Sequence, residues 1–202
     1  MSASSPLIRL GSVYGGWWVP EGSLNSKSVC YLAGVGEDVT FDLALIEKFG
    51  CHVWAMDPTP RAVSFAQQVI EPRFHFMPVG IWKEDAHLKF YSPSDETHVS
   101  HSITNLQKTQ TYFLAPCQSL RSLMADNGHT AVDLLKLDIE GAETAVLADI
   151  LSSGPLPAIL CVEFDAHEPA RRTLKRIRAL KKSGYECRKI EDRNYTFELR
   201  SA

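Results

Sequence analysis

The chain has 202 residues, of which 45% are hydrophobic and 22% are charged. This length and composition are typical of one globular domain, and they exclude disordered, collagen-like and coiled-coil proteins. The 24 acidic residues outnumber the 21 basic ones and give a net charge of −3, so the basic surplus typical of nucleic-acid-binding proteins is missing. We therefore expect a single domain over residues 1–202 and no nucleic-acid partner.

Hydropathy and cysteine usage indicate where the protein works. No run of residues approaches the ~20 apolar positions of a membrane span, and the mean hydropathy is −0.12. Residues 1–9 lack the basic and then apolar pattern of a signal peptide. The five cysteines are odd in number and none is spaced as Cys-x-x-Cys, which argues against a disulfide framework or a thiolate zinc site. We expect a cytoplasmic protein without a membrane partner, and the sequence is compatible with a homodimer.

Strand and helix patterns alternate through the first half of the chain. Residues 1–27 form an extension ahead of the first strand of the sheet. Its Tyr-Gly-Gly-Trp-Trp run at 14–18 indicates a bend that either covers a ligand cleft or packs the extension onto the sheet. After residue 27, the alternation of strand and helix patterns predicts βαβ units in a mostly parallel sheet. The expected elements are strand 28–33, helix 41–49, strand 51–56, helix 61–69 and strand 74–79.

The second half continues this alternation after a polar interruption. Residues 87–91 are expected to form a short strand, and 92–111 form a long polar loop whose length suggests a mobile cover over a site. The whole pattern predicts an α/β doubly wound sheet with a C-terminal antiparallel hairpin, and the basic residues of its last helix are best explained as a solvated face. The later elements are helix 119–126, strand 132–137, helix 143–151, strand 158–164, helix 169–182 and hairpin arms 185–190 and 195–199.

Two glycines and an aspartate mark a nucleoside site. The first strand ends in Gly34-x-Gly36, which allows a tight turn and a close approach of ligand to backbone. The helix that follows points its N-terminal amides at that ligand. Asp57 ends the second strand 21 positions after Gly36, the spacing at which an acidic residue binds ribose hydroxyls. The alternative is that the glycines only shape the turn and that Asp57 caps a helix.

The composition of this turn favours S-adenosylmethionine over a dinucleotide. A dinucleotide fold has a third glycine three positions after the second, where this chain has Val39. Glu37 and Asp38 in the turn would repel a pyrophosphate, whereas they suit the ammonium and sulfonium of S-adenosylmethionine. A nicotinamide-dependent oxidoreductase and a non-catalytic nucleoside-binding module are the remaining alternatives.

A second acidic segment follows the fourth strand. The run LLKLDIEGAE at 134–143 brings Asp138, Glu140 and Glu143 to the carboxyl end of a buried strand, and open α/β sheets bind ligands at that edge. Glu143 is best explained by the first turn of the next helix, where the helix dipole favours it. Asp138 is the last residue of the buried run and is the candidate functional carboxylate.

These motifs resemble the FkbM family of S-adenosylmethionine-dependent methyltransferases. The resemblance rests on LKLDIEGAE at 135–143, GVGEDVTFD at 34–42 and the stretch from FG at 49–50 to DPTP at 57–60. It spans roughly residues 15–164 and implies a seven-stranded class I methyltransferase fold. It also implies methyl transfer to an oxygen of a small molecule, often a sugar, glycan or polyketide hydroxyl. Leu32 stands where many members carry an acidic residue, so Glu37, Asp38 or backbone groups then hold the cofactor's amino end.

The resemblance also implies which residues bind the cofactor. The methionine portion should be lined by Gly34, Gly36 and Glu37 or Asp38, and the ribose by Asp57 with Thr59. The adenine should be flanked by Gly80 and Ile81, and Asp138 should lie close to the sulfonium.

Methyl transfer to an aliphatic hydroxyl needs a base, or a metal that lowers the pKa of the hydroxyl. Strands four and five are neighbours in this fold, so Asp138 and Glu163 should end side by side, where two carboxylates could hold Mg²⁺. Histidine is the alternative base at neutral pH, with His98 and His101 in the polar loop and His167 after the fifth strand. The candidate catalytic residues are therefore Asp138, Glu163, His167 and His101.

Overall fold

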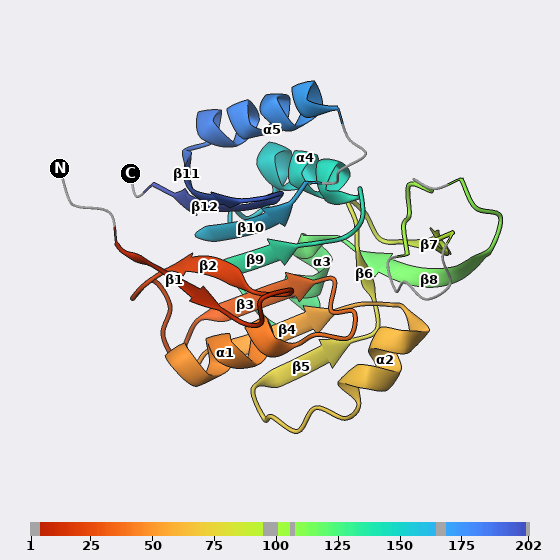
Figure 1. Ribbon diagram of the computed structural model, residues 1–202, viewed down its shortest axis with the longest axis horizontal. Coiled ribbons are helices and arrows are strands. Elements are labelled where there is room, and N and C mark those ends of the chain that lie inside the picture. The colour runs from red at the N-terminus through yellow and green to blue at the C-terminus, as the bar shows by residue number, and fades with distance from the viewer. Residues whose placement is uncertain (1–4, 95–100, 106–107, 165–168, 201–202) are drawn as a thin grey trace.

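The computed structural model of the protein describes residues 5–94, 101–105, 108–164 and 169–200, and Figure 1 shows how their elements are arranged. The strands are β1 (Leu7–Leu10), β2 (Trp17–Pro20), β3 (Val29–Ala33), β4 (His52–Met56), β5 (Phe74–Met77), β6 (Gly80–Ile81), β7 (Ala86–Tyr91), β8 (Tyr112–Gln118), β9 (Leu134–Leu137), β10 (Ile159–Glu163), β11 (Tyr185–Glu191) and β12 (Asn194–Leu199). The helices are α1 (Thr40–Phe49), α2 (Pro60–Ala66), α3 (Leu120–Asp126), α4 (Glu143–Ser153) and α5 (Ala170–Lys182).

A seven-stranded sheet with the order β11-β12-β10-β9-β3-β4-β5 forms the centre of the molecule. Strands β10, β9, β3, β4 and β5 pair in parallel, whereas β12 pairs antiparallel with both β10 and β11. When these seven strands are numbered in chain order and read from the β5 edge, the order is 3-2-1-4-5-7-6, which is that of the class I methyltransferase fold. The predicted α/β class, the mostly parallel sheet and the antiparallel C-terminal hairpin are confirmed.

The two faces of the sheet build two hydrophobic clusters, because side chains alternate along each strand. In β3, Tyr31 and Ala33 point to one face, where α3, α4 and α5 contribute the helical part of the cluster. Cys30 and Leu32 point to the other face, which is covered by α1, α2 and the β1–β2 hairpin. Continuous apolar strands such as VCYLA and ILCVE are therefore buried on both sides.

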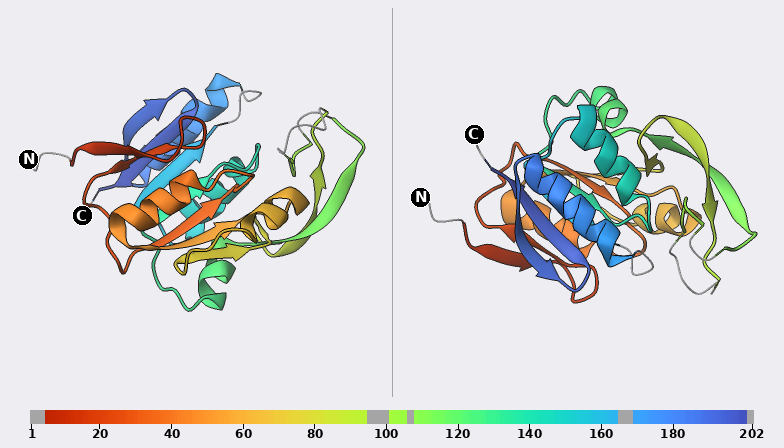
Figure 2. Two further views of the ribbon diagram at one scale, coloured as in Figure 1. Left: turned by 60° about the horizontal axis from the view of Figure 1, so that its bottom comes forward. Right: turned by 90° about the horizontal axis from the view of Figure 1, so that it is seen from above.

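Two regions depart from the sequence-based expectation. The N-terminal extension contains a β-hairpin, β1 with β2, whose Trp17 and Val19 join the cluster beneath α1. Residues 112–118, assigned to no element from the sequence, form β8, which pairs with β6 and β7 in a separate three-stranded sheet. Strands β7 and β8, with residues 92–94, 101–105 and 108–111 between them, project beyond the strand ends of the large sheet (Figure 2). We call this region the arm.

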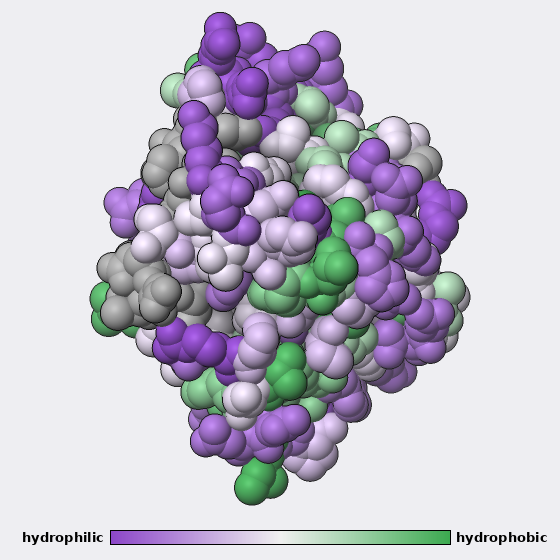
Figure 3. All heavy atoms as spheres, turned by 90° about the vertical axis from the view of Figure 1, so that its right-hand side faces the viewer, coloured by the Kyte–Doolittle hydropathy of each residue, from purple (hydrophilic) through white to green (hydrophobic). Residues whose placement is uncertain are grey.

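Helix α5 lies on the outside of the molecule and carries Arg171, Arg172, Lys175, Arg176, Arg178, Lys181 and Lys182. Only Leu180 of this helix is fully buried, and the top of the molecule, where α5 lies, is covered by hydrophilic side chains (Figure 3). Among the described ranges, no helix is both long and apolar enough to cross a bilayer.

Candidate functional site

A cavity of about 770 Å³ opens at the edge where β3, β4, β9 and β10 end. This volume is within the range of small-molecule and cofactor sites. The wall comes from the β1–β2 turn, the turns after β3 and β4, the ends of β9 and β10, and the arm. Acidic side chains outnumber basic ones in this wall, which favours a positively charged ligand. Its charged residues are Glu37, Asp38, Asp42, Asp57, Asp138, Glu140, Glu163, Asp192, Lys136 and Arg193.

The glycine turn after β3 packs directly against the end of β9. Gly34 and Gly36 have φ angles of 86° and 55°, a region that glycine enters without steric cost. A Cβ on Gly34 would collide with the carbonyl oxygen of Asp138. The Lys136 ammonium from β9 donates a hydrogen bond of 2.7 Å to the Gly34 carbonyl oxygen. The predicted cofactor turn and the predicted catalytic carboxylate thus belong to one tightly packed unit.

Asp57 fastens this turn to the end of β4. Its Oδ2 accepts hydrogen bonds from the Val35 and Gly36 backbone amides at 3.1 and 3.0 Å. Its Oδ1 accepts hydrogen bonds from the Thr59 amide at 2.9 Å and the Thr59 hydroxyl at 2.7 Å. Each carboxylate oxygen thus accepts two hydrogen bonds, and a ribose hydroxyl would have to take the place of one of them. Asp57 and Thr59 both line the cavity, and their contact with a ribose stays a prediction.

The two acidic residues of the turn already have partners within the protein. Glu37 pairs with Arg61, the Nη2 of which lies 2.6 Å from Glu37 Oε2 at the surface. Asp38 accepts hydrogen bonds from the Ser12 hydroxyl at 2.6 Å and from the Thr40 amide and hydroxyl at 2.8 and 2.6 Å. Burial opposes the charge of Asp38, but these hydrogen bonds outweigh it and lower its pKa. Both residues line the cavity while serving to hold the turn.

Asp138 and Glu163 lie side by side, because β9 and β10 pair in parallel up to the residues that precede them. Burial, the hydrogen bond that protonated Glu163 donates to Asp138, and the negative charge of Asp138 together raise the pKa of Glu163 to about 8. Arg193 Nη2 lies 3.5 Å from Glu163 Oε1 and only partly offsets this. Two adjacent carboxylates cannot both ionise easily, so the proximity of Asp138 favours the protonated form of Glu163.

The Lys136 ammonium lies next to Asp138 and compensates part of the negative charge of the carboxylate pair. Its Nζ lies 3.3 Å from Asp138 Oδ2, and the side chain is buried. Burial works against the ammonium, but the carboxylates of Asp138 and Asp42 outweigh it and raise the pKa of Lys136. Within the ranges that the structure covers, no group of three or more His, Cys, Asp or Glu could hold a metal ion. Two carboxylates that already pair with Lys136 and Arg193 do not fit a Mg²⁺ centre, so the predicted Mg²⁺ site is not supported.

The arm closes the far side of the cavity. Phe90, His101 and Ile103 line it, and the His101 ring packs edge-on against Phe113 at 5.3 Å between ring centroids. The Ser102 hydroxyl donates a hydrogen bond of 2.7 Å to the Glu140 carbonyl oxygen at the end of β9. The described part of segment 92–111 therefore reaches the cavity. Two predicted candidates, His98 and His167, lie outside the described residues.

Gly80 and Ile81, predicted to flank the adenine, form β6 and line the cavity beside the arm. A Cβ on Gly80 would lie only 2.9 Å from Phe90 Cζ and from Cys117 Sγ. The glycine therefore lets the small core of the arm pack against this strand, and its place next to the adenine stays a prediction.

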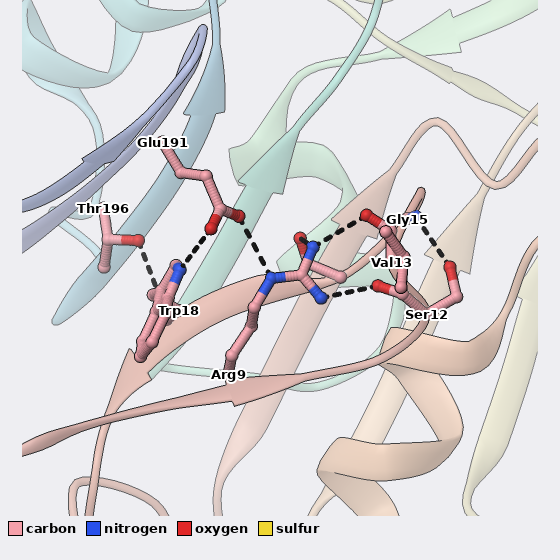
Figure 4. A network of polar contacts seen from close by, with 8 residues as sticks. Arg9, Ser12, Val13, Gly15, Trp18, Glu191 and Thr196 are labelled. Carbon is pink, nitrogen blue, oxygen red and sulfur yellow. Dashed lines mark hydrogen bonds and ion pairs between the residues drawn. The ribbon is translucent and has the colours of Figure 1, made fainter.

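The turn between β1 and β2 overhangs the opposite side of the cavity and is held by a polar network (Figure 4). Arg9 donates hydrogen bonds to the Ser12 and Val13 carbonyl oxygens at 2.6 and 2.9 Å and to Glu191 Oε2 at 3.0 Å. Glu191 Oε1 accepts a further hydrogen bond of 2.9 Å from the Trp18 indole. Within the same turn region, Trp17 and Tyr14 both line the cavity, but Trp17 is a core residue that is 2% exposed and Tyr14 is 91% exposed. The aromatic run at 14–18 thus both packs the hairpin onto the sheet and borders the cleft.

Sequence reasoning missed three groups of the cavity wall. Asp42 falls in the helix expected over residues 41–49 and received no role from the sequence, although a carboxylate among apolar positions is an available signal. Arg193 was assigned to a hairpin turn, and its place beside Glu163 follows from the antiparallel pairing of β12 with β10. Lys136 belongs to the LKLDIEGAE motif and received no role from the sequence, although a lysine inside a buried strand requires a partner.

Comparison with known proteins agrees with this architecture. The model of the family described as "Methyltransferase FkbM domain" matches residues 32–187. The human "Probable methyltransferase-like protein 24" is 25% identical over 143 residues, which are 71% of this chain and 33% of that protein. The chain thus spans about a third of the length of this curated relative.

Two solved structures match this chain, both at low sequence identity. Aeropyrum pernix fibrillarin, solved with natively bound S-adenosyl-L-methionine, is 11% identical, with a TM-score of 0.46 over 89% of this chain and 68% of that chain. Precorrin-6y C5,15-methyltransferase from Geobacter metallireducens is 9% identical, with a TM-score of 0.47 over 87% of this chain and 82% of that chain.

The family model covers most of the chain, including the glycine turn, Asp57 and the LKLDIEGAE segment, and the strand order is that of the class I fold. The chain therefore belongs to the FkbM family of S-adenosylmethionine-dependent methyltransferases.

Proposed function

We propose that the protein transfers a methyl group from S-adenosylmethionine to a hydroxyl oxygen of a small molecule, most simply a sugar, a glycan or a polyketide-like alcohol. The observation that carries this proposal is the placement of Asp138 and Glu163 at adjacent strand ends in the wall of the cavity, and the raised pKa of Glu163 supports it. Methyl transfer to an alcohol releases one proton, and a group with a pKa near neutrality is suited to take it.

The cavity wall suits S-adenosylmethionine better than a nicotinamide dinucleotide. Eight carboxylates and two basic side chains line it among the described residues. This charge disfavours a pyrophosphate and favours a ligand with an ammonium and a sulfonium. The glycine turn, Asp57 with Thr59, and Gly80 with Ile81 are the residues that would hold the cofactor. The oxidoreductase alternative is therefore not favoured.

The chain's own residues position the acceptor and accept its proton. S-adenosylmethionine supplies an electrophilic methyl group, so alignment of the acceptor oxygen accounts for much of the rate. Glu163, when ionised, takes the hydroxyl proton, and Asp138 and Arg193 keep its carboxylate in place. Phe90, His101 and Ile103 of the arm face the acceptor, and His101 is a second candidate base.

The experiment is methyl transfer from S-adenosylmethionine to a panel of sugars and polyketide-like alcohols, with S-adenosylhomocysteine measured by mass spectrometry and the new methyl ether located by NMR. Asp138→Asn keeps the size of the side chain and removes its charge, so we expect a fall in kcat of ~10²-fold or more with S-adenosylhomocysteine binding retained. Asp149→Asn on α4, outside the cavity, is the matched control. Full activity of both Asp138→Asn and Glu163→Gln would contradict the proton-accepting role.

The pH profile and a chelator separate the forms of this mechanism. Because Glu163 must be ionised to accept a proton, the rate should rise with pH and level off above about pH 8, and Glu163→Gln should abolish that limb. EDTA should leave the rate unchanged, whereas a loss that Mg²⁺ restores would mean that the carboxylates act through a metal. Binding of S-adenosylhomocysteine without turnover of any acceptor would support the non-catalytic module instead.

A further inference from the structure

Asp42 is a buried carboxylate in the wall of the cavity with an unused acceptor. It is the third residue of α1, and it is 4% exposed. Among the described residues, no donor lies within hydrogen-bond distance of its Oδ1. Burying a polar atom without a partner is costly, and native proteins rarely leave one so.

Packing alone does not explain an aspartate at this position. Its neighbours on the same helix, Phe41, Leu45 and Ile46, are buried apolar residues, and an apolar side chain would continue their face. Burial raises the pKa of Asp42 to about 6, while the positive charge of Lys136 lowers it and the negative charge of Asp38 raises it. The free protein therefore carries a costly carboxylate at neutral pH that a cationic ligand would stabilise.

The other acidic residues beside the glycine turn are less suited to receive a cation. Glu37 is held in a surface ion pair with Arg61. Asp38 accepts three hydrogen bonds from Ser12 and Thr40. Of these three carboxylates, Asp42 is the one with a free oxygen inside the cavity wall.

We propose that Asp42 receives the α-ammonium of the methionine portion of S-adenosylmethionine. This inference rests on the proposed function, since it assigns a residue to the cofactor that this function requires. An ammonium supplies compact donors to the unused oxygen and compensates its charge. It also accounts for the absence of an acidic residue at Leu32, because the carboxylate comes from the helix after the turn and not from the strand before it.

The test compares two ligands that differ in the amino-acid portion. S-adenosylhomocysteine has the ammonium, and 5′-methylthioadenosine keeps the nucleoside and the sulfur but lacks the amino acid. By calorimetry, we expect Asp42→Asn to bind S-adenosylhomocysteine ~10- to 100-fold more weakly than the wild type, the effect of losing one charge-assisted hydrogen bond. The affinity for 5′-methylthioadenosine should be unchanged, which also shows that the variant is folded.

Glu143→Gln is the matched control. Glu143 is a second buried acid, and it lies outside the cavity wall. Burial raises its pKa to about 7, although hydrogen bonds from its own backbone amide and from those of Ile139 and Gly141 act in the opposite direction. The affinity of this variant for both ligands should match the wild type. Thermal unfolding without ligand gives a second readout: Asp42→Asn should raise Tm relative to the wild type at pH 8, and this gain should shrink toward pH 4.

The pH dependence follows with a definite sign. Asp42 must be ionised to hold the ammonium, so wild-type affinity for S-adenosylhomocysteine should fall as pH drops below about 6. Lys136 from β9 and Asp38 from the turn before α1 are the charged groups that act on Asp42, and Asp138 and Glu163 share the same cavity wall. The Asp42→Asn profile should be flat over that range.

The outcomes separate this inference from the proposed function. If the wild type binds neither ligand, the cofactor assignment fails and the role of Asp42 fails with it. If the wild type binds S-adenosylhomocysteine and Asp42→Asn binds it equally well, only the role of Asp42 is overturned. Equal weakening of both ligands would likewise overturn it, because the carboxylate would then act on the shape of the cavity and not on the amino end.

Discussion

The β1–β2 hairpin and the arm flank the same cavity, yet they are attached to the protein in different ways. The hairpin inserts Trp17 and Val19 into one of the two large hydrophobic clusters and is tied to the C-terminal strands through Arg9 and Glu191. The arm has a small cluster of its own, built on Phe90, Ala115 and Cys117. It meets the main sheet through contacts such as that of Ser102 with Glu140.

This difference indicates a division of labour across the cavity. A region that shares the main core opens only at a cost near that of global unfolding, whereas a satellite cluster can open locally. We infer that the side next to the glycine turn is preformed for the cofactor and that the arm side adjusts to the acceptor. Four substitutions, taken from the largest expected effect on stability to the smallest, would break or sharpen this comparison.

Trp17→Ala should destabilise the whole protein. The side chain lies in the main core, so its removal should lower the free energy of unfolding by ~3–5 kcal/mol. Phe113→Ala, in the arm, is the matched aromatic deletion and should cost less than ~1 kcal/mol of global stability. Chemical denaturation of both variants measures this, and equal losses would show that the arm is part of the main cooperative unit.

Asp57→Ala should weaken both the fold and cofactor binding. The substitution removes the acceptor of four hydrogen bonds, so we expect a loss of ~1.5–3 kcal/mol in stability together with weaker binding of S-adenosylhomocysteine. Thr59→Val removes one of these bonds and should have a smaller effect. Chemical denaturation measures the stability of the two variants, and calorimetry measures their affinity for S-adenosylhomocysteine. Unchanged affinity of Asp57→Ala would contradict the predicted contact of Asp57 with the ribose.

Glu191→Gln should have a smaller, pH-dependent effect. Hydrogen bonds from Trp18 and Arg9 lower the pKa of Glu191, so its contribution is complete above the unfolded value of about 4.3 and is lost as pH falls through the lowered folded value. At pH 7 we expect a loss of ~1 kcal/mol. The difference between variant and wild type should shrink below about pH 4, and a constant difference would mean that the carboxylate charge is not involved.

Ser102→Ala should change stability least and acceptor binding most. It removes the hydrogen bond from the arm to the Glu140 carbonyl oxygen, which is worth ~1 kcal/mol or less. We expect the arm to exchange its amide hydrogens faster and the KM for the acceptor to rise several-fold, with S-adenosylhomocysteine affinity unchanged. An altered cofactor affinity with normal acceptor KM would reverse the roles assigned to the two sides.

The main sheet, the edge at which the cavity opens and strand β7 of the arm could be predicted from the sequence, whereas β8 and the N-terminal hairpin could not. Apolar runs such as residues 29–33 and 134–137 are long, uninterrupted and spaced by helices, so the period of each element is clear. Strand β8 alternates but contains Pro116, which lowers any strand assignment. The hairpin at 7–20 has short arms, and its register depends on contacts with Glu191 and Thr196, more than 170 positions away.

The candidate site divides in the same way. Asp138 and Glu163 fall at strand ends, so their approach follows from the strand order alone. The importance of Asp42 and Lys136 follows from their burial. Burial depends on how α1 and β9 pack, and the spacing of a motif does not reveal it. A sequence motif identifies the residues at strand ends. The roles of Asp42 and Lys136 become visible only when their positions relative to the other charged groups of the cavity are known.

The basic helix α5 gives the protein an electrical polarity that its net charge conceals. Its seven basic side chains and absence of acidic ones stand against a net charge of −3 for the whole chain, so the remainder of the molecule is strongly negative. Figure 3 shows the hydrophilic cover over this helix at one end of the molecule. Such a concentration of positive charge orients the protein near negatively charged surfaces. The protein should therefore bind a cation exchanger near neutral pH through α5, in spite of its negative net charge.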